Sequence, residues 1–237
     1  MQNPNSPKIY PSTSTETQGS WYAILAVAIG AFALVTSEFL PVGVLNSVAT
    51  DLHISVGTAG LIITLPGVMA AFAAPLLPIF VKQLDRRYVL IFLTAIMVVA
   101  NTITAFADSF NLLLVSRLIL GIAIGGFWAT AIALSGKLAP AKLPIAKATA
   151  VVMAGVTFAT VLGVPIGTWL SEFYGWRSAF GITAAIGLIV LLLQIIFLPK
   201  LTPDAAIHLR DLPALLRIPK ARSGMLILLL IGLAHFC

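Results

Sequence analysis

The sequence predicts an all-α polytopic membrane protein. Its 237 residues are 59% hydrophobic and 9% charged, whereas a soluble globular domain is near half apolar and a quarter charged. The mean hydropathy is +1.05, and the apolar residues form continuous runs about as long as a bilayer-crossing helix, which needs roughly 20 residues. Strands of an outer-membrane barrel are excluded, because such strands are about ten residues long and alternate in polarity.

The first 20 residues, MQNPNSPKIYPSTSTETQGS, are rich in Ser, Thr, Pro and Asn, so that 1–20 is expected to be a disordered tail. They do not have the features of a signal peptide. The polar stretch is long, has one Lys, and leads into an apolar run far longer than the roughly 7–15 residues of a signal core.

Six complete spans make up the next part of the chain, 21–198. They are expected at about 21–46, 57–80, 88–107, 110–136, 145–170 and 177–198. A longer polar segment, 199–222, predicts a linker; its stretch LRDLPALLRIPK fits either a surface amphipathic helix or a solvated loop. Residues 223–237 begin a seventh span of only about 22 Å at 1.5 Å per residue, so we expect a truncated helix seven.

Basic residues predict the orientation. Twelve of the 14 Lys and Arg residues lie at one set of span ends, and Arg177 alone lies at the opposite ends. Short loops rich in Lys and Arg stay in the cytoplasm. The N-terminus and the linker are therefore expected inside the cell. The same argument explains the net charge of +6 without nucleic acid as a partner.

Two ionisable residues lie well inside the complete spans: Glu38, in VTSEFLPVG, and Arg117 in the fourth span. Counted from the external ends of their spans, they lie roughly 13 Å and 10 Å deep. A charge at the centre of a membrane helix costs about 2.5–3.5 kcal/mol on the insertion scale, and such residues mark ion or proton pathways or pair with each other.

Two hypotheses explain this pair. In the first, Glu38 and Arg117 form a static ion pair that fixes helix packing. In the second, Glu38 alternately binds and releases a proton. Burial favours a neutral carboxyl group and a nearby guanidinium favours the ionised form, so a change in their distance or hydration would load and unload the proton.

Small residues suggest close helix packing. The fifth span contains Gly163 and Gly167 in a GxxxG pattern around Pro165, and the fourth contains Gly121 and Gly125. Such spacing lets helices approach each other, and proline bends a helix. Packing alone is the simpler explanation for each glycine taken singly.

The loop after the second span has a structural explanation, and the sequence has no motif of the common enzyme classes. In VKQLDRRYVL, orientation explains Arg86 and Arg87, whereas Asp85 is expected to cap a helix N-terminus or to interact with a helix dipole. The sequence contains no HExxH, GxSxG, Walker loop or CxxC motif, so we expect no enzyme activity, metal or cofactor. The single cysteine, Cys237, excludes an intrachain disulfide.

Taken in order, three segments resemble the major facilitator superfamily, in its twelve-helix drug:proton antiporter branch. EFLPVGVLNSVATDLHIS resembles the end of that branch's first helix, SRLILGIAIGGFW its fourth-helix Arg–Gly motif, and GVPIGTWLSEFYGWRSAF its fifth-helix antiporter motif. DRRYVL and GGFWA are most similar to the purine ribonucleoside and arabinose-like efflux permeases of the branch.

The resemblance implies the six-helix N-terminal half of a major facilitator fold, built as a 3+3 inverted repeat, in a bacterial inner membrane. It implies efflux of a small organic solute in exchange for protons, with the missing C-terminal half as partner and the substrate path between the halves. The residues with implied roles are the proton-coupling pair Glu38 and Arg117, the gate residues Asp85, Arg86 and Arg87, the helix-four residues Gly121 and Gly125, the helix-five residues Gly163, Pro165 and Gly167, and the substrate-lining candidates Thr36, Trp128 and Phe158.

The resemblance has two departures. The loop after the second span contains no glycine beside its Asp-Arg core, so its turn departs from the family's pattern. The chain also supplies only one of the family's two halves. Alternatives are a non-transporting scaffold or receptor, an intramembrane enzyme, or a fragment inactive on its own. Nucleosides, sugars and amphipathic drugs all fit as substrates.

Overall fold

The structure is a computed structural model that describes residues 20–81, 84–140, 143–200 and 223. Within these ranges the helices are α1 (Trp21–Asp51), α2 (Val56–Ala59), α3 (Leu61–Val81), α4 (Arg86–Ala105), α5 (Phe110–Leu138), α6 (Ile145–Tyr174) and α7 (Trp176–Phe197). Six of the helices in these described ranges are apolar and long enough to cross a membrane, which confirms the predicted all-α polytopic class. The tail 1–19, nearly all of the linker 199–222 and the predicted truncated helix 223–237 lie outside the described residues.

Local sequence explains where the helices begin and end. Asp85 caps α4, because its carboxylate accepts a hydrogen bond of 2.9 Å from the backbone N–H of Arg87. This confirms the predicted capping role. Gly175 separates α6 from α7 with a φ of +80°, a conformation that side chains with a Cβ rarely adopt.

The first helix is longer than its apolar run predicts. We expected its end near residue 46, but α1 continues to Asp51. The last turns are polar, and the Thr50 hydroxyl donates to the carbonyl oxygen of Asn46 at 2.9 Å within the helix. Apolarity marks the part of a helix that crosses the hydrocarbon, not the part that extends beyond it.

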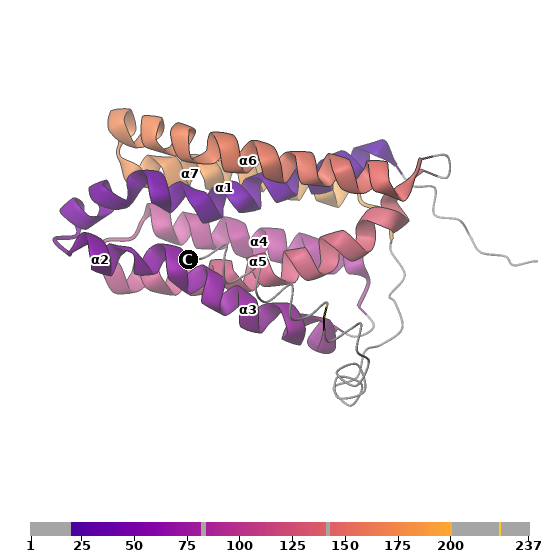
Figure 1. Cartoon of the computed structure of the whole chain (residues 1–237), viewed down its shortest axis with the longest axis horizontal. Helices are drawn as coiled ribbons and strands as arrows, with labels where there is room; N and C mark the ends of the chain where they lie inside the picture. Colours follow the sequence, from indigo (N-terminus) through magenta and orange to yellow (C-terminus); the bar gives the residue numbers. More distant parts are fainter. Residues whose placement is uncertain (1–19, 82–83, 141–142, 201–222, 224–237) are drawn as a thin grey trace, which may run out of the picture.

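The six long helices form two related triplets, α1–α3–α4 and α5–α6–α7. Helix α1 packs most extensively on α6, and its counterpart α5 packs most extensively on α3. Likewise α4 packs on α5, and its counterpart α7 packs on α1, while α4 and α7 pack on each other. Exchanging the triplets reproduces the same pairs, as an inverted repeat requires. In Figure 1, α1, α6 and α7 lie together in the upper part of the view, above α3, α4 and α5.

Glycines allow the closest helix crossings. A Cβ added to Gly121 would lie 2.6 Å from the carbonyl oxygen of Pro66, and one added to Gly125 would lie 2.5 Å from that of Ala70. These two glycines of α5 therefore let the backbone of α3 approach directly. On the other side of the bundle, Gly155 of α6 contacts the backbone of Ala28 in α1, a crossing that the sequence analysis missed.

Candidate functional site

Arg117 of α5 is fully buried, at 0% exposure, and three other helices surround its guanidinium. Nη2 donates to the hydroxyl of Thr104 in α4 at 2.5 Å, and Nη1 donates to the carbonyl oxygen of Ser37 in α1 at 3.3 Å. The guanidinium carbon lies 4.8 Å from the ring centroid of Phe180 in α7, within cation–π range. The site is therefore built where the two triplets meet.

Pro41 explains why the Ser37 carbonyl is available. Proline has no backbone N–H, so the carbonyl four residues earlier loses its normal hydrogen bond in a helix. Pro41 lies inside α1, and Ser37 is the residue four positions before it. Arg117 therefore donates to the carbonyl oxygen that Pro41 leaves without a helical partner.

Glu38 directly follows Ser37 on α1, and it is partly exposed in the described part of the chain. Within that part, no hydrogen bond or ion pair joins Glu38 to Arg117, whose donated bonds go to Ser37 and Thr104. The structure thus joins Arg117 to the residue that precedes Glu38 in α1. It offers no direct contact in support of the static-pair hypothesis.

Sequence analysis did not single out the buried polar side chains around Arg117. The amide nitrogen of Asn101 donates to the Ser37 hydroxyl at 2.8 Å, and Thr104 shares a hydrogen bond of 2.7 Å with Ser116. All four of these side chains are buried. The available signal was the spacing of Asn101 and Thr104, three residues apart in an apolar span, which places both on one helix face.

The two glycines of the predicted helix-five motif lie against α1, next to residues that precede and follow Glu38. A Cβ added to Gly163 would lie 3.5 Å from the Cα of Thr36, and a Cβ added to Gly167 would lie 3.0 Å from the Cγ of Leu40. The hydroxyl oxygen of Thr36 is buried and has no protein partner among the described residues. At these two glycines the contact between α6 and α1 is looser than the contact of Gly121 and Gly125 with α3.

The other proposed substrate-lining residues differ in their environment. Trp128 is partly buried, packs against the core, and makes an edge-on contact with Phe127 at a centroid distance of 6.4 Å. Phe158 of α6 is 60% exposed. Of the two, Phe158 is the more exposed.

The predicted gate residues lie at the end where α4 begins and α7 ends. Besides the cap formed by Asp85, Arg87 donates from Nη2 to the carbonyl oxygen of Ile195 at 2.5 Å. A cation near the last carbonyls of a helix also interacts favourably with the helix dipole. The link joins α4 to α7, while Arg86 is partly exposed.

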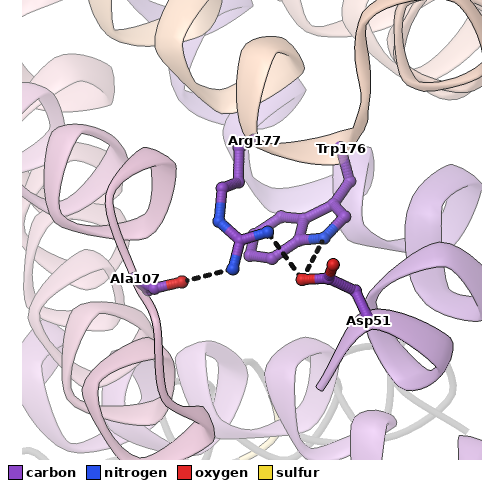
Figure 2. Close-up of polar contacts among 4 residues, drawn as sticks. All are labelled: Asp51, Ala107, Trp176 and Arg177. Atoms are coloured by element: carbon purple, nitrogen blue, oxygen red, sulfur yellow. Dashed lines mark hydrogen bonds and ion pairs between the residues drawn. The ribbon is translucent and has the colours of Figure 1, made fainter. Parts of the chain in front are cut away.

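At the opposite end, Arg177 forms the centre of a second cluster (Figure 2). Its Nη1 is 2.6 Å from Asp51 Oδ2 at the end of α1, and Nη2 donates to the carbonyl oxygen of Ala107 at 2.9 Å. The indole N–H of Trp176 also donates to Asp51, at 3.3 Å. A shallow depression of about 460 Å³ adjoins Asp51 and Trp176. The one basic residue at the predicted external ends is thus neutralised locally.

The described residues contain no group of three or more His, Cys, Asp or Glu side chains that could bind a metal ion.

Comparisons with known proteins place this geometry in a family. The profile of the Major Facilitator Superfamily matches residues 27–237. The purine ribonucleoside efflux pump NepI of Escherichia coli O6:K15:H31 (strain 536 / UPEC) is 36% identical over 210 residues, which cover 89% of this chain and 53% of that protein. NepI of Salmonella paratyphi B (strain ATCC BAA-1250 / SPB7) is 35% identical over 207 residues, covering 87% and 52% respectively. The chain spans about half the length of these curated relatives.

A solved structure supports the same assignment at the level of the fold. The proton:xylose symporter XylE, bound to 6-bromo-6-deoxy-D-glucose, superposes with a TM-score of 0.66 at 15% identity, covering 76% of this chain and 44% of XylE. The six helices therefore have the architecture of one half of that fold. Because the family profile also matches most of the sequence, the chain belongs to the Major Facilitator Superfamily.

Proposed function

We propose that the chain is the N-terminal half of a bacterial inner-membrane transporter that exports a small organic solute in exchange for protons. In this proposal the N-terminus is cytoplasmic, and Glu38 binds the proton. The observation that supports it most strongly is the arrangement at α1. Glu38 is partly exposed, while neutral acceptors on Ser37 and Thr104 bind the neighbouring Arg117.

This arrangement suits a proton carrier because the guanidinium does not depend on the carboxylate. A carboxylate locked in an ion pair would have to break that pair to accept a proton. Glu38 has no such bond to Arg117 in the described residues, so protonation leaves the bonds of Arg117 unchanged. In this proposal Arg117 acts on the proton affinity of Glu38 through its charge and not through a direct bond.

The relatives suggest the substrate class and the need for a partner. Proteins matching this chain are named purine ribonucleoside efflux pumps, and the match covers only about half of their length. We therefore propose an uncharged, hydroxyl-bearing ring compound such as a purine ribonucleoside as substrate. A second six-helix half would complete the path, and this chain reconstituted alone is expected to show no transport.

The test uses the complete transporter that contains this half, purified and reconstituted into liposomes under an imposed pH gradient. Wild-type protein should move purine ribonucleosides when the gradient is present and not when it is collapsed. Glu38→Gln keeps the size and most of the hydrogen-bonding capacity of the side chain but cannot titrate. It should abolish gradient-driven transport while leaving substrate binding at high pH largely intact.

Glu172→Gln is the matched control, because Glu172 is an exposed glutamate near the end of α6. Transport must be normalised to folded protein, since a packing role for Glu38 would lower both together. Full gradient coupling in well-folded Glu38→Gln protein would eliminate Glu38 as the proton carrier. Absence of any solute flux from the wild-type transporter across a nucleoside, sugar and drug panel would favour a scaffold or receptor instead.

A further inference from the structure

Two buried polar atoms of the Arg117 cluster have no protein partner among the described residues, and one is a donor while the other is an acceptor. Arg117 Nε carries a hydrogen to donate, and Asn101 Oδ1 is an acceptor. Most buried polar groups are hydrogen-bonded to protein or to ordered water. An unsatisfied donor and an unsatisfied acceptor within one cluster therefore suggest a molecule that can bind both.

The two residues belong to one closed set of contacts. Asn101 donates to the side chain of Ser37 at 2.8 Å, and Arg117 donates to the carbonyl oxygen of the same residue at 3.3 Å. Arg117 also donates to Thr104, which lies one turn after Asn101 on α4. Ser37 and α4 thus hold the amide and the guanidinium in the same buried cluster.

The orientation of the Asn101 amide follows from its neighbours. The Ser37 hydroxyl donates its hydrogen to the carbonyl oxygen of Ala33 at 2.8 Å, so its oxygen can only accept from Asn101. The same Asn101 nitrogen also donates to the carbonyl oxygen of Met97 at 3.0 Å. Exchanging N and O in this amide would set an oxygen against two acceptors. The amide oxygen is therefore the atom left without a partner.

We infer that this cluster binds one internal water molecule, which accepts a hydrogen bond from Arg117 Nε and donates one to Asn101 Oδ1. Buried waters typically satisfy such groups with about three hydrogen bonds. Asn101 is then a positioning residue for Arg117. With the water in place, neutral acceptors bind the guanidinium through Nε, Nη1 and Nη2.

The consequence for proton coupling rests on the proposed function. Without the water, Arg117 retains its charge but has an unpaired buried donor, which is costly. The carboxylate of Glu38, beside Ser37 on α1, is the acceptor that can replace the water. A closer guanidinium would stabilise the ionised carboxylate. Loss of the water should therefore shift proton-dependent transport toward lower pH.

The direct test is a structure of the complete wild-type transporter in lipid nanodiscs, at a resolution that shows ordered waters. One water within hydrogen-bonding distance of both Arg117 Nε and Asn101 Oδ1 is the expected result. A direct bond between Asn101 and Arg117 Nε, or a dry site with Nε bound to Glu38, would overturn the inference. This result does not depend on whether the protein transports protons.

The second test compares variants of Asn101 in the transport assay. Asn101→Leu keeps the approximate volume of the side chain but removes the amide oxygen that binds the water. It should move the pH midpoint of transport down by about one unit, a tenfold change in proton affinity. Asn101→Ser retains a hydroxyl that can bind the water and should stay near the wild-type midpoint. It also remains informative where Asn101→Leu folds poorly.

Thr102→Val is the matched control, because Thr102 is exposed on the same helix and its hydroxyl bonds only to the carbonyl oxygen of Val98 among the described contacts. It should leave the midpoint unchanged. A folded Asn101→Leu variant with the wild-type midpoint would refute the positioning role. If the wild type shows no pH-gradient coupling, the proposed function fails, and the water site is decided by the structure alone.

Discussion

Gly125 of α5 and Gly163 of α6 should respond differently to substitution by alanine. At Gly125, an added methyl group would lie 2.5 Å from the carbonyl oxygen of Ala70 and 2.9 Å from the nitrogen of Ala74. Both are backbone atoms, so α3 and α5 must move apart. At Gly163, the nearest atom would be the Cα of Thr36 at 3.5 Å, an ordinary van der Waals contact.

The expected magnitudes follow from these distances. Overpacking a well-packed interface costs about 1–3 kcal/mol, so Gly125→Ala should lower the free energy of unfolding by about that amount. Gly163→Ala meets no clash and replaces glycine in a helix interior, which favours the helix by up to about 1 kcal/mol. The two variants should therefore differ by about 1–4 kcal/mol.

The assay is reversible unfolding of the purified chain in mixed detergent micelles. Gly181→Ala in α7 serves as a control, because the nearest atom to its added methyl group is 3.8 Å away. Equal stability of Gly125→Ala and Gly163→Ala, or a larger loss in Gly163→Ala, would refute the packing argument. Should Gly163→Ala fold normally yet abolish transport in the complete protein, the motif in α6 would have a role beyond packing.

Three further predictions concern other contacts. A double-mutant cycle of Asp51→Asn and Arg177→Gln should give a coupling of about 0.5–1 kcal/mol that falls with added salt, because the pair is partly exposed; zero coupling at low salt would contradict it. Thr94→Val should cost about 1–2 kcal/mol, since it leaves the amide oxygen of buried Gln194 without its bond of 2.8 Å, and adding Gln194→Leu should restore most of the loss; additive losses in unfolding experiments would argue otherwise. A cysteine at Asp108, in a background without the native cysteine, should react with an impermeant thiol reagent in intact cells, and protection from it would reverse the proposed orientation.

The sequence was sufficient to predict the long helices, because a helix needs roughly 20 apolar residues to cross a bilayer. In the described part of the chain, the six predicted apolar runs correspond to six helices of membrane-crossing length, with ends within a few residues of those predicted. The predicted helix bounds are wrong where polar residues continue or begin a helix outside its apolar run. Polar residues continue α1 to Asp51, and a short helix, α2, precedes α3. A hydropathy pattern cannot locate a helix end that lies in water.

The candidate site was less predictable because it depends on which faces of the helices meet. Charge in an apolar span identified Glu38 and Arg117. Nothing in the sequence indicated that Arg117 would donate to a backbone oxygen instead of a carboxylate. That contact requires Pro41 to release the Ser37 carbonyl and the two triplets to place α5 near it. Backbone acceptors have no sequence signature.

The bonding of Arg117 bears on how a proton could be held inside a bilayer. A buried guanidinium remains charged, so its donors need partners in every state of the protein. If Glu38 were its main partner, each protonation would leave that charge unsatisfied. Ser37 and Thr104 instead supply acceptors that do not titrate. Under the proposed function, Arg117 then provides a constant positive potential, and Glu38 is the group whose charge changes during the transport cycle.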